Sequence, residues 1–226
     1  MNGGCSVCSL PCASPYLLTS RKMKREPTVF VVDDDLEVQD ALRWLIESVA
    51  LPVETFDSAE AFVDVVGPDR SGCLVLDVRM PGMGGLRLLE NLESLGILLP
   101  VIVLTGHGDV PLAVRAMKAG ALDFVEKPCA DQELLDRIYN ALQRDANLRA
   151  EMARKAATNA KLEALTPRER EILERLLKGQ ANKVIAAELE ISERTVESHR
   201  RHIKEKMNVR SLAELAQIVL QHSSKE

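Results

Sequence analysis

The sequence has no apolar run of the roughly 18 residues that a helix needs to span a bilayer. It also has no even, regularly spaced set of cysteines. Cys5, Cys8 and Cys12 form a cluster, whereas Cys73 and Cys129 stand alone. This odd, irregular set argues against a secreted disulfide scaffold and indicates a cytoplasmic protein in a reducing compartment.

The N-terminal 27 residues hold four basic residues but not the long apolar core of a signal peptide. We expect residues 1–27 to be a disordered extension. Three cysteines there offer metal ligands, but no histidine or fourth cysteine lies nearby in the sequence, so a metal site is the weaker alternative. Met23 leads directly into the first apolar strand and is an alternative start of translation.

The composition and the charge distribution suit a globular protein with two unlike parts. The 226 residues are 46% hydrophobic and 28% charged, with a net charge of −5. Residues before 163 hold 17 basic and 23 acidic side chains, and the rest hold 12 and 11. The first part should therefore repel polyanions, while the second part is able to meet one locally.

From residue 28 onward, short apolar runs alternate with segments of helical spacing. The expected strands are 29–33, 53–56, 73–77, 101–105 and 122–126, and the expected helices are 36–49, 58–66, 84–95, 110–119 and 131–145. This alternation predicts an α/β fold, a doubly wound five-stranded parallel sheet with helices on both faces. We take the strand order to be 2-1-3-4-5, which is the flavodoxin-like order.

The texture of the sequence changes after the last of these helices. We place the α/β domain at 28–143, an exposed helical linker at 144–162 and an all-α domain of four helices at 163–226. The alternative is that the linker simply prolongs the preceding helix. Thr166, Pro167 and Glu169 have the spacing of a capping box at the start of the first helix of the second domain.

Polar side chains follow four of the predicted strands at their carboxyl ends. The first strand ends at Asp33 and Asp34, the third ends at Asp77 and the fourth ends at Thr105. The fifth runs into Lys127. In the order 2-1-3-4-5 these strands are neighbours, so the side chains should converge on one shallow pocket. Each alone has an ordinary explanation, such as a helix cap or a solvated lysine, and only the joint placement indicates a site.

Carboxylates crowded into such a pocket repel one another unless a cation is present. Oxygen ligands suit Mg²⁺, and an aspartate beside Mg²⁺ can attack phosphorus to form an aspartyl phosphate. A lysine and a threonine would then neutralise and hold the phosphoryl group. The sequence contains no GxxxxGK[ST] loop for ATP, so the phosphoryl donor must be another molecule.

The segments "VVDDD", "LVLDVRMPGMGGL" and "PVIVLTGHGDVPLAVRAMKAGALDFVEKP" resemble the receiver domain of two-component response regulators. The resemblance implies that Asp77 is the phosphoacceptor, that Asp34 binds Mg²⁺ directly, and that Asp33 acts mainly through water. It further implies that the backbone carbonyl of Arg79 is the third protein ligand of the metal.

The same resemblance assigns the remaining receiver residues. It places Thr105 and Lys127 against the phosphoryl group and makes Thr105 and Phe124 a switch pair, with phenylalanine at a position that is often tyrosine. The Lys127–Pro128 bond resembles a site where the peptide is cis. His107 follows Thr105 and is an alternative phosphate contact, although a solvated loop histidine is the simpler explanation.

The C-terminal part fits a helix-turn-helix, whose second helix enters the major groove of DNA. Ile185, Ala186, Val196 and Ile203 are expected to face its core, together with His199. Six basic residues against three acidic ones between 193 and 210 give a local charge of +3, which suits a phosphate-facing stripe or merely a solvated helix.

The segments "LTPRERE", "GQANKVIAAELEIS" and "RTVESHRRHIKEKM" resemble the LuxR-type DNA-binding module. By this resemblance the helix Glu193–Met207 enters the groove. Base-edge contacts are implied for Glu197, Ser198 and Arg201, and backbone contacts are implied for Thr195, Arg200 and Lys204. Glu197 accepts from cytosine or orients Arg201, and the residues alone leave both open.

Together these features predict a transcription regulator of the NarL/FixJ type rather than an enzyme with an external substrate. A sensor histidine kinase would phosphorylate Asp77 with Mg²⁺, and the homodimer would bind promoter DNA. Two rivals are a phosphatase of the haloacid-dehalogenase type and a receiver whose output domain binds protein. The first requires D-x-D-x-[TV], whereas the chain has Glu37 at the final position. A flavodoxin-like flavin site is disfavoured by the acidic loop.

Overall fold

The computed structural model of the chain describes residues 26–106 and 110–223. The expected extension, the Cys5–Cys12 cluster, Met23 and His107 lie outside the described residues. The strands are β1 (Thr28–Val32), β2 (Val53–Phe56), β3 (Gly72–Leu76), β4 (Val101–Thr105) and β5 (Asp123–Glu126). The helices are α1 (Leu36–Ser48), α2 (Ala59–Val65), α3 (Gly85–Asn91), α4 (Val110–Lys118), α5 (Asp131–Glu163), α6 (Pro167–Leu177), α7 (Asn182–Glu188), α8 (Glu193–Met207) and α9 (Leu212–Ser223).

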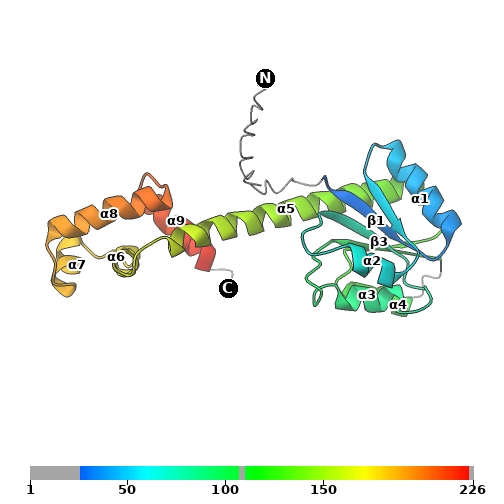
Figure 1. Cartoon of the computed structure of the whole chain (residues 1–226), viewed down its shortest axis with the longest axis horizontal. Coiled ribbons are helices and arrows are strands. Elements are labelled where there is room, and N and C mark those ends of the chain that lie inside the picture. The colour runs from blue at the N-terminus through cyan, green and yellow to red at the C-terminus, as the bar shows by residue number, and fades with distance from the viewer. Residues whose placement is uncertain (1–25, 107–109, 224–226) are drawn as a thin grey trace, which may run out of the picture.

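The five strands form one parallel sheet in the order β2-β1-β3-β4-β5, which confirms the predicted topology. Strands β1, β3 and β4 are buried along their whole length. Continuous apolar runs produce this burial, because a central parallel strand has helices on both of its faces. All strands point the same way, so their carboxyl ends share one edge of the sheet (Figure 1).

Two apolar cores lie on opposite faces of the sheet. Phe62 of α2, Leu88 of α3 and Ala116 of α4 pack on one face. Ile46 of α1 and Ile138 of α5 pack on the other. This division follows from the alternation of side chains along each strand, which sends successive residues to opposite faces.

Side-chain caps start the first two helices. The Asp35 carboxylate accepts from the backbone N–H groups of Glu37 and Val38, and the Ser58 side chain accepts from that of Ala61. Helix α3 is shorter than the predicted 84–95, because the chain after Asn91 continues as turns.

Helix α5 is much longer than the predicted 131–145, because its helical residues continue without a break to Glu163. It runs from the sheet to the C-terminal helices in Figure 1. Asp145 is buried against the sheet, where its carboxylate accepts from the backbone N–H of Gly72 at 3.0 Å and from Arg149. Arg149 also donates to the carbonyl of Arg70. These contacts attach the first turns of the predicted linker to the α/β domain.

Helices α6 to α9 enclose a third core, which we call the helical domain core. Its buried residues include Ile172 of α6, Ile185 of α7, Ile203 of α8 and Leu215 of α9. Thr166 and Glu169 form the predicted capping box at the start of α6. Of the described helices, none is long and apolar enough to cross a membrane.

The carboxylate of Glu169 is nearly buried between α6 and α8. It accepts from Lys206 Nζ at 2.7 Å and from the backbone N–H of Thr166 at 2.8 Å. Burial alone would raise the pKa of Glu169, but the hydrogen bonds from Lys206 and Thr166 outweigh burial and hold the pKa below its ordinary 4.5. The ionised carboxylate therefore stabilises the helical domain.

This lowered pKa predicts a pH-dependent loss of stability. The contribution of Glu169 is fully present above pH 4.5, the ordinary value, and is lost as the pH falls through the lower pKa of the folded state. Urea unfolding followed by circular dichroism should therefore show wild type losing stability in this window relative to Glu169→Gln. The exposed Glu174→Gln on the same helix is the control, and a wild-type advantage over Glu169→Gln that did not change with pH would contradict the prediction.

Candidate functional site

The carboxyl edge of the sheet brings Asp33, Asp77 and Lys127 together. Lys127 follows β5, and its ammonium lies 2.5 Å from Asp33 Oδ2 and 3.0 Å from Asp77 Oδ2. All three side chains are largely buried, with 21% of Lys127, 3% of Asp33 and 11% of Asp77 exposed. One ammonium thus bridges two carboxylates that reach the edge from neighbouring strands.

Asp33 is held from several sides. Its Oδ1 accepts from the backbone N–H of Asp35 at 3.0 Å, and its backbone carbonyl accepts from Gln39 Nε2 at 2.7 Å. Gln39 is buried on α1, and sequence analysis did not single it out. A signal was present, because Gln39 lies three residues before Leu42 and seven before Ile46, on the apolar face of the helix.

The pKa shifts of Asp33 and Lys127 show how burial and charge oppose each other at this edge. Burial raises the pKa of Asp33, and the hydrogen bond from Lys127 offsets only part of that effect. Burial would lower the pKa of Lys127, but its hydrogen bonds to Asp33 and Asp77 outweigh burial and raise it. The lysine is therefore held as an ammonium, while the cluster still carries uncompensated acidic groups.

Asp34 and Arg79 follow the ends of β1 and β3 at the same edge, and both are exposed. The Asp34 side chain is exposed, and it makes no hydrogen bond or ion pair with any other described residue. The backbone N–H of Arg79 donates to Asp77 Oδ1 at 2.8 Å, which fixes the second oxygen of that carboxylate. The loop after β3 thereby orients Asp77 while Asp34 faces solvent.

The predicted switch residues lie on the last two strands. Thr105 is fully buried, and its hydroxyl is without a hydrogen-bond partner in the described part of the chain. A buried hydroxyl without a partner costs free energy of folding, so this hydroxyl is suited to form a hydrogen bond with a bound ligand. Phe124 is half-buried and packs on the core beneath α4.

The chemistry of the donor set fits a hard divalent cation. Asp33, Asp34 and Asp77 supply only carboxylate oxygens, the ligand type that Mg²⁺ prefers. Lys127 contacts two of these carboxylates, and Asp34 adds a third acidic group with no ion-pair partner among the described residues, so negative charge is left that a cation would neutralise. The predicted metal ligands and the predicted phosphoryl contacts thus lie on one edge, while their individual roles stay predictions.

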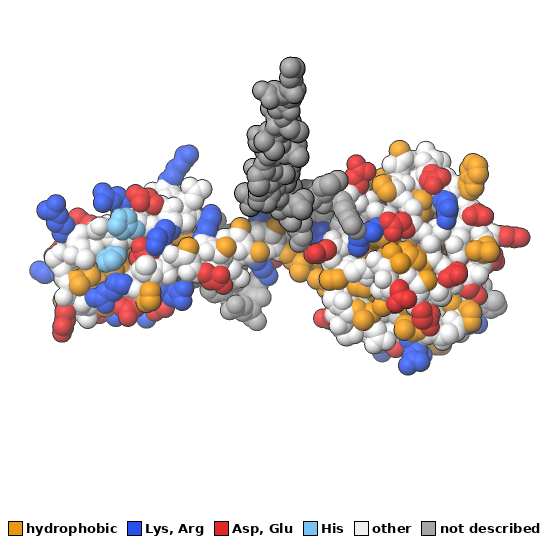
Figure 2. Space-filling view, in the orientation of Figure 1, with side chains coloured by type: hydrophobic (Ala, Val, Ile, Leu, Met, Phe, Trp, Pro, Cys, Tyr) orange, Lys and Arg blue, Asp and Glu red, His pale blue; other side chains and the backbone are white. Residues whose placement is uncertain are grey.

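The predicted DNA-contact residues share α8. Glu197 and Arg201 are exposed and form no hydrogen bond or ion pair with each other, whereas Ser198 and Lys204 are half-buried. The predicted core residues Val196 and Ile203 are fully buried, which fixes the opposite face of the helix. On the face shown in Figure 2, basic side chains are prominent over the helical domain.

Two of the predicted phosphate contacts already have partners within the module. Arg200 donates to the side chain of Asn182 on α7. The backbone N–H of Thr195 donates to the N-cap Ser192 at 3.1 Å, and the two hydroxyl oxygens lie 2.8 Å apart. Arg200 therefore helps to join α7 to α8, in addition to any contact with a ligand.

Two family models match the chain. The model described as the response regulator receiver domain matches residues 29–139, and the model of bacterial regulatory proteins of the LuxR family matches residues 163–219. The first match covers the sheet and its acidic edge, and the second covers α6 to α8 and most of α9.

Curated relatives and solved structures align over most of the chain. Nodulation protein W of Bradyrhizobium diazoefficiens is 46% identical over 83% of this chain and 82% of its own length, and the transcriptional regulatory protein FixJ of that organism is 41% identical over 85% and 94%. The structure of response regulator StyR is 46% identical, with a TM-score of 0.82 and coverage of 87% of this chain and 99% of its own.

The close approach of Gly85 to Asp77 gives a test of the site's framework. A Cβ atom at Gly85 would lie 1.9 Å from the backbone oxygen of Asp77, so Gly85→Ala must displace the loop after β3. We expect a loss of about 1–3 kcal/mol in the free energy of urea unfolding. Gly67→Ala is the matched control, because nothing lies within 4 Å of its Cβ position. Equal stability of the two variants would refute this packing constraint.

Proposed function

Because the chain belongs to the two-component response regulators that join a receiver domain to a LuxR-type DNA-binding domain, we propose that phosphorylation of Asp77 controls its binding to DNA. A sensor histidine kinase is the proposed donor, and promoter DNA is the proposed target. The observation that carries the proposal is the Lys127 bridge between Asp33 and Asp77 at the carboxyl edge of the sheet.

Asp77 is the proposed nucleophile. One of its carboxylate oxygens attacks the phosphorus of a phosphohistidine, the O–P bond forms as the N–P bond breaks, and the kinase imidazole leaves with the bonding electrons. The Arg79 N–H, 2.8 Å from Oδ1, orients the carboxylate. Lys127 neutralises charge that develops on the phosphoryl oxygens, and the Thr105 hydroxyl, which has no hydrogen-bond partner among the described residues, donates to one of them.

Mg²⁺ is the proposed cofactor. Asp34, Asp77 and the backbone carbonyl of Arg79 would hold it directly, and Asp33, whose two oxygens accept from the backbone N–H of Asp35 and from Lys127, would assist through water. When bound, the ion supplies positive charge against the acidic side chains and the incoming phosphoryl group. The exposure of Asp34 at the carboxyl edge of the sheet leaves it open to such a ligand.

The haloacid-dehalogenase alternative finds no support in the local contacts. That chemistry would require Asp35 as a second acidic group in the site. Asp35 instead caps α1, because its Oδ1 accepts from the backbone N–H of Glu37 at 2.9 Å. Its charge therefore stabilises the start of the helix.

Phosphorylation would act through the residues beneath the acidic edge. A phosphoryl group on Asp77 would supply the partner that the buried Thr105 hydroxyl lacks among the described residues, and would bias Thr105 toward a second arrangement that remodels the face formed by α4, β5 and α5. Phe124, half-buried beside α4, is the proposed second member of the switch. The rearranged receiver would form a homodimer, which presents two DNA-binding domains to two half-sites.

In the DNA-binding domain, α8 is the proposed groove-reading helix. Its exposed residues Glu197 and Arg201, together with Ser198, are the proposed base contacts, whereas Thr195, Arg200 and Lys204 are proposed to hold the DNA backbone. Arg201 and Lys204 have no hydrogen-bonding side-chain partner among the described residues, so both are free to meet DNA.

A small-molecule phosphoryl donor with Mg²⁺ tests the proposed nucleophile. We expect intact-mass analysis to show one added phosphoryl group on wild type and none on Asp77→Asn, because the amide is not a nucleophile. Asp35→Asn is the matched control and should still be phosphorylated, since Asp35 caps α1 outside the bridged cluster. Phosphorylation of Asp77→Asn to the wild-type extent would exclude the assignment.

The same samples test the switch. Light scattering should show a dimer, and duplex binding should tighten, for phosphorylated wild type and not for Asp77→Asn. If phosphorylated wild type kept the oligomeric state and the DNA affinity of the unphosphorylated protein, the switch would be refuted. The assignment of the phosphorylation site would still stand.

Substitutions on α8 test the DNA interface, using a duplex obtained by genome-wide mapping of bound sites. Arg201→Ala should weaken specific binding by about 1–3 kcal/mol and relax the preference for one base pair. Lys204→Ala should weaken binding to all duplexes alike. It should also lower the slope of log affinity against log salt concentration, the salt slope, by about 1. The control is Lys178→Ala, an exposed lysine just after α6. If Lys178→Ala and Lys204→Ala gave the same salt slope, the backbone contact would be wrongly assigned.

A further inference from the structure

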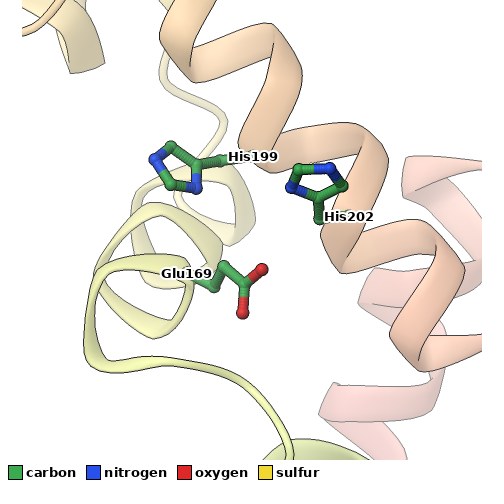
Figure 3. A group of neighbouring side chains, drawn as sticks. All are labelled: Glu169, His199 and His202. Atoms are coloured by element: carbon green, nitrogen blue, oxygen red, sulfur yellow. The ribbon is translucent and has the colours of Figure 1, made fainter.

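A second cluster of possible metal ligands lies in the DNA-binding domain, far along the chain from the acidic edge. Glu169 on α6 and His199 and His202 on α8 each offer one ligand atom, and these atoms all lie within 4.8 Å of one another. Figure 3 shows the two imidazole rings and the carboxylate around a common space between the two helices. The proposed phosphorylation and DNA contacts use none of these side chains.

The spacing and the packing bring the three groups together. His199 and His202 are three residues apart, so they lie on adjacent positions of one helical face. The helical domain core holds α6 against α8 through buried residues such as Ile172 and Ile203. This face of α8 therefore meets the first turn of α6, where the capping box has already fixed Glu169.

The polar contacts of the cluster leave potential ligand atoms available. The Nδ1 atom of His199 is buried and has no hydrogen-bond partner among the described residues. Lys206 and the backbone N–H of Thr166 both donate to Oε2 of Glu169, and neither engages Oε1. Hydrogen bonds of this kind hold a ligating carboxylate in place in protein metal sites.

We propose that Glu169, His199 and His202 bind a divalent transition-metal ion, with zinc as the test case, and that the bound ion ties α8 to α6. Two imidazoles and one carboxylate form a ligand set that zinc takes in proteins, with the fourth position left to water. Imidazole selects such an ion over Mg²⁺, which prefers oxygen ligands. His202 is exposed, so the ion has a path from solvent.

The site would act on the helix that carries the proposed DNA contacts. His199 follows Ser198 and His202 follows Arg201, so an ion held by both histidines fixes the orientation of that part of α8. An ion that binds only the folded domain also raises its resistance to unfolding by mass action. The proposal depends neither on phosphorylation nor on DNA binding.

Calorimetric titration of the full chain with Zn²⁺ tests the site. The background protein carries Cys5→Ser, Cys8→Ser and Cys12→Ser, which remove three thiols that could bind zinc, and excess Mg²⁺ is added to compete for the acidic edge of the receiver. We expect this background protein to bind Zn²⁺, and we expect His202→Asn and Glu169→Gln each to weaken binding more than about tenfold, because each removes a ligand. Zn²⁺ should also raise the thermal unfolding temperature of the background protein more than that of His202→Asn.

The matched control is His107→Asn, which removes the same type of side chain from the other domain and should leave Zn²⁺ affinity unchanged. Circular dichroism verifies that each variant is folded, which is expected for His202→Asn because the side chain is exposed. Equal Zn²⁺ affinity in the background protein and in His202→Asn overturns the proposal. The absence of Zn²⁺ binding by the background protein, or an equal loss in His107→Asn, overturns it as well.

Discussion

The bridge from Lys127 to Asp33 and Asp77 is the interaction on which the receiver site depends. It joins the ends of β1 and β3 to the segment after β5, so three parts of the sheet must be in register before the bridge exists. The carboxylates of Asp33 and Asp77 contact the same ammonium, so they lie close enough to repel each other, and burial makes the repulsion stronger. The ammonium lowers that cost, and the exposed Asp34 leaves further negative charge at this edge of the sheet. The charge of the site therefore favours binding of a cation, and it favours an anionic group such as a phosphoryl group only when a cation is also bound.

The rest of the α/β domain positions these few side chains. Asp33 is fixed by Gln39 and by the backbone of Asp35, while Asp77 is fixed by the backbone of Arg79. Thr105 differs from them, because its buried hydroxyl has no partner among the described residues. Asp77 and Thr105 end neighbouring strands, β3 and β4. A charge added at the rigidly held Asp77 would therefore act on the surroundings of a strand whose last hydroxyl is unsatisfied among the described residues.

The long helix α5 links this chemistry to the helical domain. Its first turns pack on the sheet, and Asp145 extends the attachment through the backbone of Gly72. Helix α5 then continues to the start of the second domain, where the capping box of Thr166 and Glu169 begins α6. Glu169 serves both the cap and the contact with α8, which places a charged group between the helices that position the proposed DNA-reading surface.

The sequence by itself determined the strands and most helix starts, because apolar runs, helical spacing and cap residues are local signals. The strand order was adopted from the flavodoxin-like fold class and is not fixed by those local signals. The sequence also placed Asp33, Asp77, Thr105 and Lys127 at one edge, since parallel strands share their carboxyl ends. Only the tertiary structure decided which groups touch. The Lys127 bridge, the packing of Asp145 on Gly72 and the meeting of Glu169 with His199 and His202 all join residues from separate elements. Such contacts depend on how helices and strands pack, and no local sequence pattern encodes the distance between side chains on separate elements.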